Sequence, residues 1–302
     1  MPGADVRTVF AQTGVVRLNG AFSAEAARRI SDAVWRYAER KAGLRRDDPT
    51  SWRGGWPGIS WKGLKRNPVF APVLANEAVG DTLDAVFGTG GWQVPKPGAQ
   101  MLFTLPGPQP WVLPDAWHMD SGFERPSWPA FGVKLFAFFD EVGPEGGGTM
   151  ILPGTHLVVD HYRRQLPAGT GAGMANWRPF LRHHPFLAQL LQGKSLPDGG
   201  RSLVGAVGDV NGIPVAIEEL TGQPGDVVIT HLHVFHTVSP NVSAVPRQML
   251  GKAVYAAAPA SRQDGHDCWS PTTMTNVRTA MHSEPAVTRQ GAAFAARPLR
   301  AP

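Results

Sequence analysis

The chain has a single cysteine, Cys268, among its 302 residues. One cysteine excludes an internal disulfide framework and a cysteine-rich zinc site, and it fits a reducing compartment. Long apolar runs are missing too, because the longest, around Leu135–Phe139, is far short of the roughly 20 residues that cross a bilayer. Met1–Leu18 contains no apolar block that would indicate a secretory signal. We therefore expect a soluble cytoplasmic protein without a membrane segment.

Strong charge of one sign is also absent. The chain carries 29 Lys and Arg against 24 Asp and Glu, a formal net charge of +5. The tightest basic group, Lys62, Lys65 and Arg66, does not approach the five or six consecutive like charges typical of nucleic-acid-binding tails. We predict a scattered, solvated basic surface and no nucleic-acid partner.

What the chain has instead is enough length for a large core, with many chain reversals from 35 Gly and 28 Pro. A chain of about 300 residues buries roughly 75% of its unfolded surface. Hydrophobic spacing predicts a short strand over 14–18, a helix capped by Ser23 that ends near Lys41, and a second helix over about 76–87. The first 97 residues are therefore expected to be mainly helical.

From residue 98 onward, short apolar runs alternate with Gly and Pro, which favours an antiparallel barrel or jelly roll. The candidate strands are 100–105, 132–140, 149–152, 215–220, 226–233 and 248–257. The fold class is thus mainly β with helical decoration, in the α+β sense. We expect one domain over 1–302: a helical region over about 1–97, a barrel core over about 98–257 with an insertion over about 157–211, and a C-terminal tail over 258–302. Within the insertion, 177–191 is expected to be helical with a break at Pro185.

His118-Met119-Asp120 is the first candidate for chemistry. Residues two apart on an extended segment point to the same side, so one imidazole and one carboxylate share a space. A third, neutral imidazole would complete the two-histidine, one-carboxylate triad that binds non-haem Fe(II) with open positions. Taken alone, the pair is more typical of a surface turn.

The third imidazole has three candidates, His231, His233 and His236. On one regular strand, His231 and His233 would point to one side and His236 to the other. The spacing by itself does not choose between them.

Together these segments resemble the phytanoyl-CoA dioxygenase family of Fe(II)- and 2-oxoglutarate-dependent oxygenases. The matching pieces are His118-x-Asp120, the stretch from Gly146-Gly147 to Pro153-Gly154-Thr155-His156, Gly225-Asp226, and His236-x4-Asn241-x-Ser243-x3-Arg247. They occur in the family's order, and the opening over 10–38 is similar as well. The resemblance implies a double-stranded β-helix, that is, a jelly-roll, cupin-like barrel. It also implies Fe(II) held by His118, Asp120 and His236. His233 has no counterpart in the family and stays as the alternative to His236.

The resemblance further implies 2-oxoglutarate as cosubstrate, with O2. Arg247 would pair its distal carboxylate, since a guanidinium binds a carboxylate with two parallel hydrogen bonds. Family members often add Ser or Thr two residues after the distal histidine, where this chain has Val238, leaving Thr237 or Ser239 as substitutes. Further cosubstrate contacts are expected from Gln100 or Met101, depending on register, and from Phe136.

The expected reaction is hydroxylation, or another oxidation, of an unactivated C–H bond in a small organic molecule, for example in secondary metabolism. Asp120 separates the chain from related halogenases, which have Gly or Ala there. No catalytic residue is expected beyond the metal ligands. Trp61, Trp117 and Phe123 are candidate substrate contacts, although the tryptophans are equally suited to packing the N-terminal helix on the barrel.

Two other classes remain as alternatives. A nucleic-acid-dealkylating oxygenase fits the basic charge, but such enzymes typically carry a second arginine six residues after the first, where this chain has Ala253. A non-catalytic or non-iron cupin-like barrel usually has additional histidine or glutamate ligands, and no second histidine-rich strand is evident.

Overall fold

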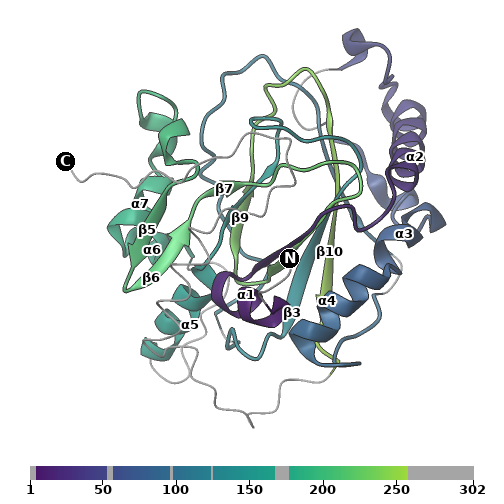
Figure 1. Cartoon of the computed structure of the whole chain (residues 1–302). Helices are drawn as coiled ribbons and strands as arrows, with labels where there is room; N and C mark the ends of the chain where they lie inside the picture. Colours follow the sequence, from purple (N-terminus) through teal and green to yellow (C-terminus); the bar gives the residue numbers. More distant parts are fainter. Residues whose placement is uncertain (1–4, 53–56, 96–97, 124, 167–176, 258–302) are drawn as a thin grey trace.

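The computed structural model describes residues 5–52, 57–95, 98–123, 125–166 and 177–257 (Figure 1). Its strands are β1 Val15–Leu18, β2 Gln100–Thr104, β3 Gly132–Phe138, β4 Thr149–Leu152, β5 Val207–Val210, β6 Ile213–Ala216, β7 Glu218–Glu219, β8 Val227–His231, β9 Phe235–Val238 and β10 Arg247–Tyr255. Its α-helices are α1 Val6–Thr13, α2 Ala24–Ala42, α3 Ala71–Leu74, α4 Glu77–Phe87, α5 Thr155–Gln165, α6 Trp177–Arg182 and α7 Pro185–Leu190. The tail expected over 258–302 lies outside the described residues.

Two antiparallel sheets form the centre of the fold. The large sheet has the strand order β1-β8-β3-β10-β2, and the small sheet has the order β7-β4-β9. Apolar side chains from both sheets meet in one buried cluster, including Phe136 and Met249 from the large sheet and Ile151 from the small one. The sheets therefore pack face to face around an interior, as expected for the jelly-roll class, although hydrogen bonds do not close them into one barrel.

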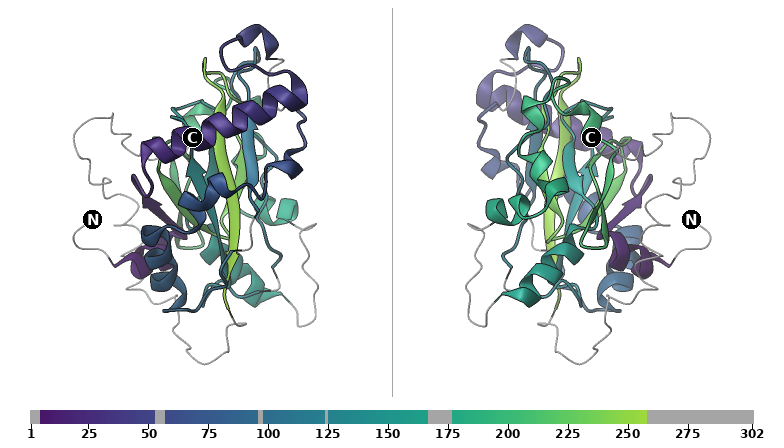
Figure 2. Two further views of the ribbon diagram at one scale, coloured as in Figure 1. Left: turned by 90° about the vertical axis from the view of Figure 1, so that its right-hand side faces the viewer. Right: turned by 90° about the vertical axis from the view of Figure 1, so that its left-hand side faces the viewer.

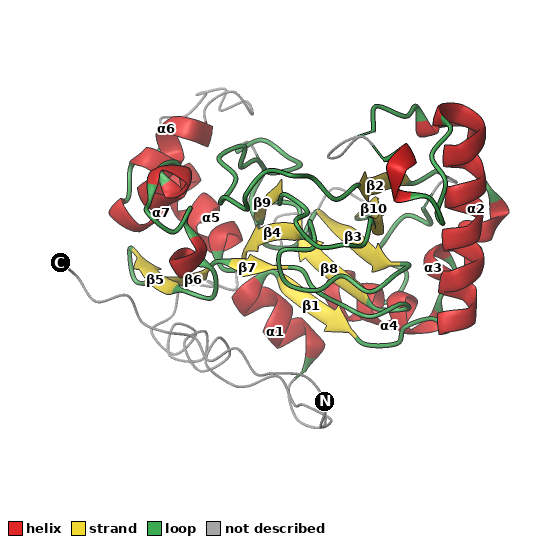
Figure 3. Cartoon of the chain, turned by 90° about the horizontal axis from the view of Figure 1, so that it is seen from above, coloured by secondary structure: helices red, strands yellow, loops and turns green. Residues whose placement is uncertain are grey.

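Helices cover the outer faces of both sheets (Figure 3). Figure 2 shows α2 lying across the large sheet, where Ile30 and Val34 pack in one buried cluster with Met101 and Leu135. On the other side, the small sheet packs against α5, α6 and α7 through a second cluster that contains Phe235. The resulting order of layers is helices, large sheet, small sheet and helices, which leaves the interior between the sheets for a site.

The α2 and α4 helices begin where their capping residues predict. The Ser23 side chain accepts a hydrogen bond from the Ala26 amide, and Asn76 caps α4 in the same way. The expected break at Pro185 separates α6 from α7. Three helices, α1, α3 and α5, were not expected. Before α5, Gly154, at φ +91°, makes the turn after β4 and leads directly into the helix, where His156 is buried in the first turn.

Two predicted strands are wrong in their extent, because one ends early in a turn and the other divides between different sheets. The strand expected over 226–233 ends at His231, and Leu232–Val234 form a turn that carries the chain from the large sheet to the small one. The strand expected over 215–220 is interrupted at Ile217 and divides into β6 and β7. Periodicity within a short apolar run does not show which partner strand each half will find.

Among the described helices, none combines the length and apolar character needed to cross a membrane.

Candidate active site

His118 and Asp120 lie on an extended segment beside β9. The amide of His118 donates to the carbonyl of His236 at 3.0 Å, and the reverse bond measures 2.7 Å. This pairing adds the segment to the edge of the small sheet. Because side chains alternate along it, His118 and Asp120 turn toward His236, while Trp117 and Met119 turn into the cluster beneath α5–α7.

Both imidazoles are oriented by backbone carbonyls. Nδ1 of His118 lies 3.2 Å from the Ala116 oxygen, and Nδ1 of His236 lies 3.1 Å from the Val234 oxygen. A carbonyl can only accept, so each Nδ1 carries the hydrogen and each Nε2 keeps its lone pair. Such a second hydrogen bond fixes the tautomer of histidines that bind metal.

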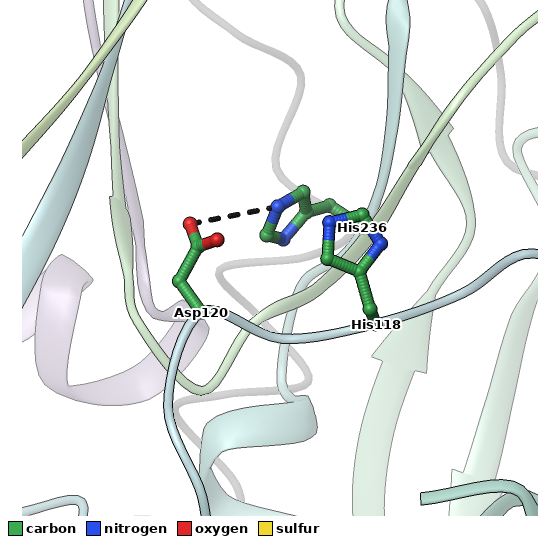
Figure 4. Close-up of side chains that lie close together, drawn as sticks. All are labelled: His118, Asp120 and His236. Atoms are coloured by element: carbon green, nitrogen blue, oxygen red, sulfur yellow. Dashed lines mark ion pairs between the residues drawn. The ribbon is translucent and has the colours of Figure 1, made fainter. Parts of the chain in front are cut away.

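The three side chains can reach a single metal ion. One ligand atom from each of His118, Asp120 and His236 lies within 4.8 Å of the others. Asp120 Oδ2 and His236 Nε2 are 3.6 Å apart (Figure 4). Two neutral imidazoles and one carboxylate are the donor set of non-haem Fe(II) sites, so these residues fit that metal.

Lys134, on β3, is a site residue that the sequence reasoning missed. Its Nζ lies 2.8 Å from Asp120 Oδ2 and 3.4 Å from His236 Nε2, and its side chain is only 9% exposed. The available signal was a single charged residue within the otherwise apolar run of β3.

The surroundings keep Asp120 ionised and His236 neutral. Burial disfavours the charged carboxylate, but His236, Lys134 and His118 around it lower the pKa of Asp120 overall. Burial, and then the Lys134 ammonium, lower the pKa of His236 to about 3. These are the protonation states that metal binding requires.

Arg247 is buried in the interior at the start of β10, with 1% of its surface exposed. Its Nη2 donates to Thr104 Oγ1 at 2.8 Å, whereas Nε and Nη1 have no hydrogen-bond partner within the described ranges. Burial lowers its pKa to about 10, so the group is still a cation at neutral pH. A buried guanidinium with two open donors is prepared for a carboxylate.

The strand register distinguishes Gln100 from Met101. Gln100 and Thr104 lie on the same face of β2 and pair with Gly251 and Arg247, so Gln100 is on the inward face, at its exposed end. The Met101 side chain packs in the outer core with α2, and it is not available to the site. Phe136 faces the interior and packs edge-to-face on His236, with ring centroids 6.0 Å apart.

The other two histidines of the chain's histidine-rich segment lie away from the triad. Nε2 of His233 donates to the Gly122 carbonyl at 2.9 Å, and Nδ1 is 2.9 Å from Ser127 Oγ, so both ring nitrogens are occupied. Nδ1 of His231 accepts the His233 amide at 2.9 Å. The expectation that His233 could replace His236 does not agree with these contacts.

The three aromatic residues expected to contact substrate lie in packed cores instead. Trp61 stacks on Tyr37 and contacts Phe103 on the outer face of the large sheet, with ring centroids 5.6 and 5.4 Å away. Trp117 and Phe123 are fully buried in the cluster between the small sheet and α5–α7. Trp61 therefore packs the N-terminal helices on the sheet, which is the alternative stated for the tryptophans.

Comparison with known proteins points to one family. The model of the phytanoyl-CoA dioxygenase (PhyH) family matches residues 10–189, a range that includes His118 and Asp120 but ends before His236 and Arg247. Curated proteins gave no match.

The solved structures similar to this chain share little sequence with it. The epimerase SnoN, in complex with Fe3+, alpha ketoglutarate and nogalamycin RO, has 15% identity and a TM-score of 0.51, over 98% of this chain and 94% of that one. EvdMO1 has 19% identity and a TM-score of 0.50, over 85% of this chain and 50% of its own. AviO1 from Streptomyces viridochromogenes Tue57 has 17% identity and a TM-score of 0.49, over 85% and 97% of the two chains. The match to the family model covers more than half of the length of this chain. The chain therefore belongs to the phytanoyl-CoA dioxygenase family of non-haem iron, 2-oxoglutarate-dependent oxygenases.

Proposed function

We propose that this oxygenase holds Fe(II) through Nε2 of His118, Nε2 of His236 and the carboxylate of Asp120, and that it oxidises an unactivated C–H bond of a small organic molecule. The observation that carries the proposal is the pair of imidazoles whose Nδ1 atoms are bound to carbonyls, so that both Nε2 lone pairs turn toward one carboxylate. Bound Fe(II) and 2-oxoglutarate supply the oxidising chemistry with O2.

Arg247 is the proposed partner of the distal carboxylate of 2-oxoglutarate. Either Nε or Nη1, together with the second hydrogen of Nη2, can donate two parallel hydrogen bonds, while Thr104 accepts the other hydrogen of Nη2 and fixes the plane of the guanidinium. Thr104 thus supplies the hydroxyl that many family members place two residues after the distal histidine, where this chain has Val238. Gln100 and Phe136 are proposed to line the same cosubstrate, because both lie on the inward face of the large sheet, Phe136 buried and Gln100 at the exposed end of β2.

The protein's own contribution is to orient these groups and keep water away. Phe136, Met249 and Ile151 form an apolar wall between the sheets, which strengthens the charge interactions of Arg247. Such a wall also limits reaction of the oxidant with anything other than a bound substrate. We further propose that residues 1–302 form one oxygenase domain with this site at its centre.

Hydroxylation is the proposed outcome, because Asp120 occupies the carboxylate position. SnoN is titled an epimerase, so the assay must also register other oxidations. The test is anaerobic titration with Fe(II) and 2-oxoglutarate, followed by O2-dependent succinate release in the presence of candidate small molecules. Succinate formation by the wild type and its loss in D120A are expected. A wild-type protein that binds neither Fe(II) nor 2-oxoglutarate would overturn the proposal.

A further inference from the structure

We propose that Lys134 is a second cationic contact for 2-oxoglutarate and binds the carboxylate of its keto-acid end, opposite the carboxylate that Arg247 binds. The inference rests on the proposed function and adds a residue that the family resemblance did not include. It begins from the position of an ammonium group among the three proposed metal ligands.

Lys134 reaches the site because its strand turns it inward. Val133 and Leu135 pack in the outer core, so the lysine between them points to the interior. Gly251 on the neighbouring β10 leaves room for the side chain, since a Cβ at that position would lie 3.3 Å from Lys134 Cε. The side chain therefore passes over the glycine, and its Nζ lies beside Asp120 and His236.

The charges around the Lys134 ammonium favour the binding of an anion beside it. Among the described residues, Asp120 is the carboxylate that pairs with Lys134, and the same carboxylate is also a proposed ligand of a dication. With Fe(II), Lys134 and Arg247 together, the site would carry several positive charges, against Asp120 beside Lys134 and the half-buried Glu219, whose charge acts on Arg247. A lysine ammonium has three donors, of which Asp120 accepts one at 2.8 Å and His236 Nε2 lies within reach of a second at 3.4 Å, so at least one is left for another acidic group beside it.

That acidic group is most simply the keto-acid carboxylate, because it must lie next to the metal. Lys134 pairs with Ala253 across β3 and β10, whereas Arg247 is six residues earlier on β10. The two cations thus enter the interior from different ends of the same pair of strands. A dicarboxylate with one end at Arg247 and the other end at the triad would contact both cations.

Binding to the Ni(II)-loaded protein, measured by calorimetry, tests the assignment without turnover. Three probes separate the two ends: 2-oxoglutarate, pyruvate with the keto-acid end alone, and glutarate with simple carboxylates alone. We expect K134M to weaken 2-oxoglutarate and pyruvate by the same factor, about tenfold, and to leave glutarate unchanged. We expect R247M to weaken 2-oxoglutarate and glutarate and to leave pyruvate unchanged.

K252M is the matched control, because Lys252 is on the neighbouring strand and donates to the Gly98 carbonyl. It should bind all three probes like the wild type. Unchanged affinity of K134M for both keto acids would overturn the inference. Loss of Ni(II) binding in K134M would overturn it as well, because Lys134 would then belong to the metal-ligand set alone. A wild-type protein that binds Ni(II) but no 2-oxoglutarate would instead overturn the proposed function.

Discussion

Thr104 and Arg247 lie directly opposite each other on β2 and β10, and the Thr104 hydroxyl accepts the guanidinium Nη2 at 2.8 Å. The contact joins the first residue of β10 to the last residue of β2. It satisfies one nitrogen of a fully buried cation, whereas the other two nitrogens, Nε and Nη1, are buried without a partner among the described residues. A single hydroxyl therefore determines how the guanidinium presents itself to a ligand.

Removing this hydroxyl should weaken cosubstrate binding without removing the cation. In T104V, we expect about a tenfold higher KM for 2-oxoglutarate, since a hydrogen bond to a charged group contributes about 1.5–3 kcal/mol. In R247M, we expect a larger rise, by roughly a hundredfold. T82V is a matched control, because Thr82 is buried in α4 and bonds to the Ala78 carbonyl. Equal KM values for T104V and T82V would contradict the role of Thr104.

Each proposed metal ligand should be required for metal binding. We expect H118A, D120A and H236A to lose stoichiometric Fe(II), measured by anaerobic titration, because each removes one of three protein ligands. H233A should still bind one equivalent, although it loses the contacts to Ser127 and Gly122 and should be less stable. Full iron content in H236A would transfer the third ligand to another residue.

The sequence was most informative where local geometry decides the outcome. Alternation placed His118 and Asp120 on one side of an extended segment, and the structure has them together. The motif order indicated the jelly-roll class of the fold. It could not show the turn at Leu232–Val234, which depends on two separate sheets, nor the register that places Gln100 inward and Met101 outward. Lys134 was missed for the same reason, since its partners come from distant segments.

The register difference between Gln100 and Met101 can be measured. M101A should lower the free energy of unfolding by about 2–5 kcal/mol through loss of buried contacts, with an unchanged KM for 2-oxoglutarate. Q100A should have the reverse signature, a raised KM with nearly wild-type stability. Denaturant unfolding and steady-state kinetics on both variants check this. A raised KM in M101A alone would show that the opposite register operates.

Trp61 should behave as a core residue. Its ring stacks on Tyr37 and touches Phe103, so W61A should cost about 3–5 kcal/mol in the free energy of unfolding. W61F keeps most of the packing and should recover much of that loss. Both variants, assayed below their unfolding temperature, should release succinate with the wild-type substrate dependence. A changed substrate preference in W61F would place the indole in the substrate pocket after all.

Acid should destabilise the protein through its buried histidines. Burial lowers the pKa of His156 to about 4 from its ordinary value of 6.5, so the unfolded chain binds a proton first as the pH falls. Stability from this group is complete above about pH 6.5, decreases by up to about 3 kcal/mol toward pH 4, and then stays constant. Denaturant unfolding of H156Q at several pH values should show a shallower decrease. H161Q, on the half-exposed side of α5, is the control and should follow the wild type.

The turn at Leu232–Val234 has a mechanical consequence. Thr230, which pairs with Lys134, and His236 are only six residues apart on the chain, yet they belong to opposite sheets. This short segment of backbone therefore connects the two sheets that enclose the site, and its length limits the distance between Lys134 on β3 and His236 on β9. A single glycine inserted after His233 would lengthen the segment, and it would affect binding of the metal and of the cosubstrate together.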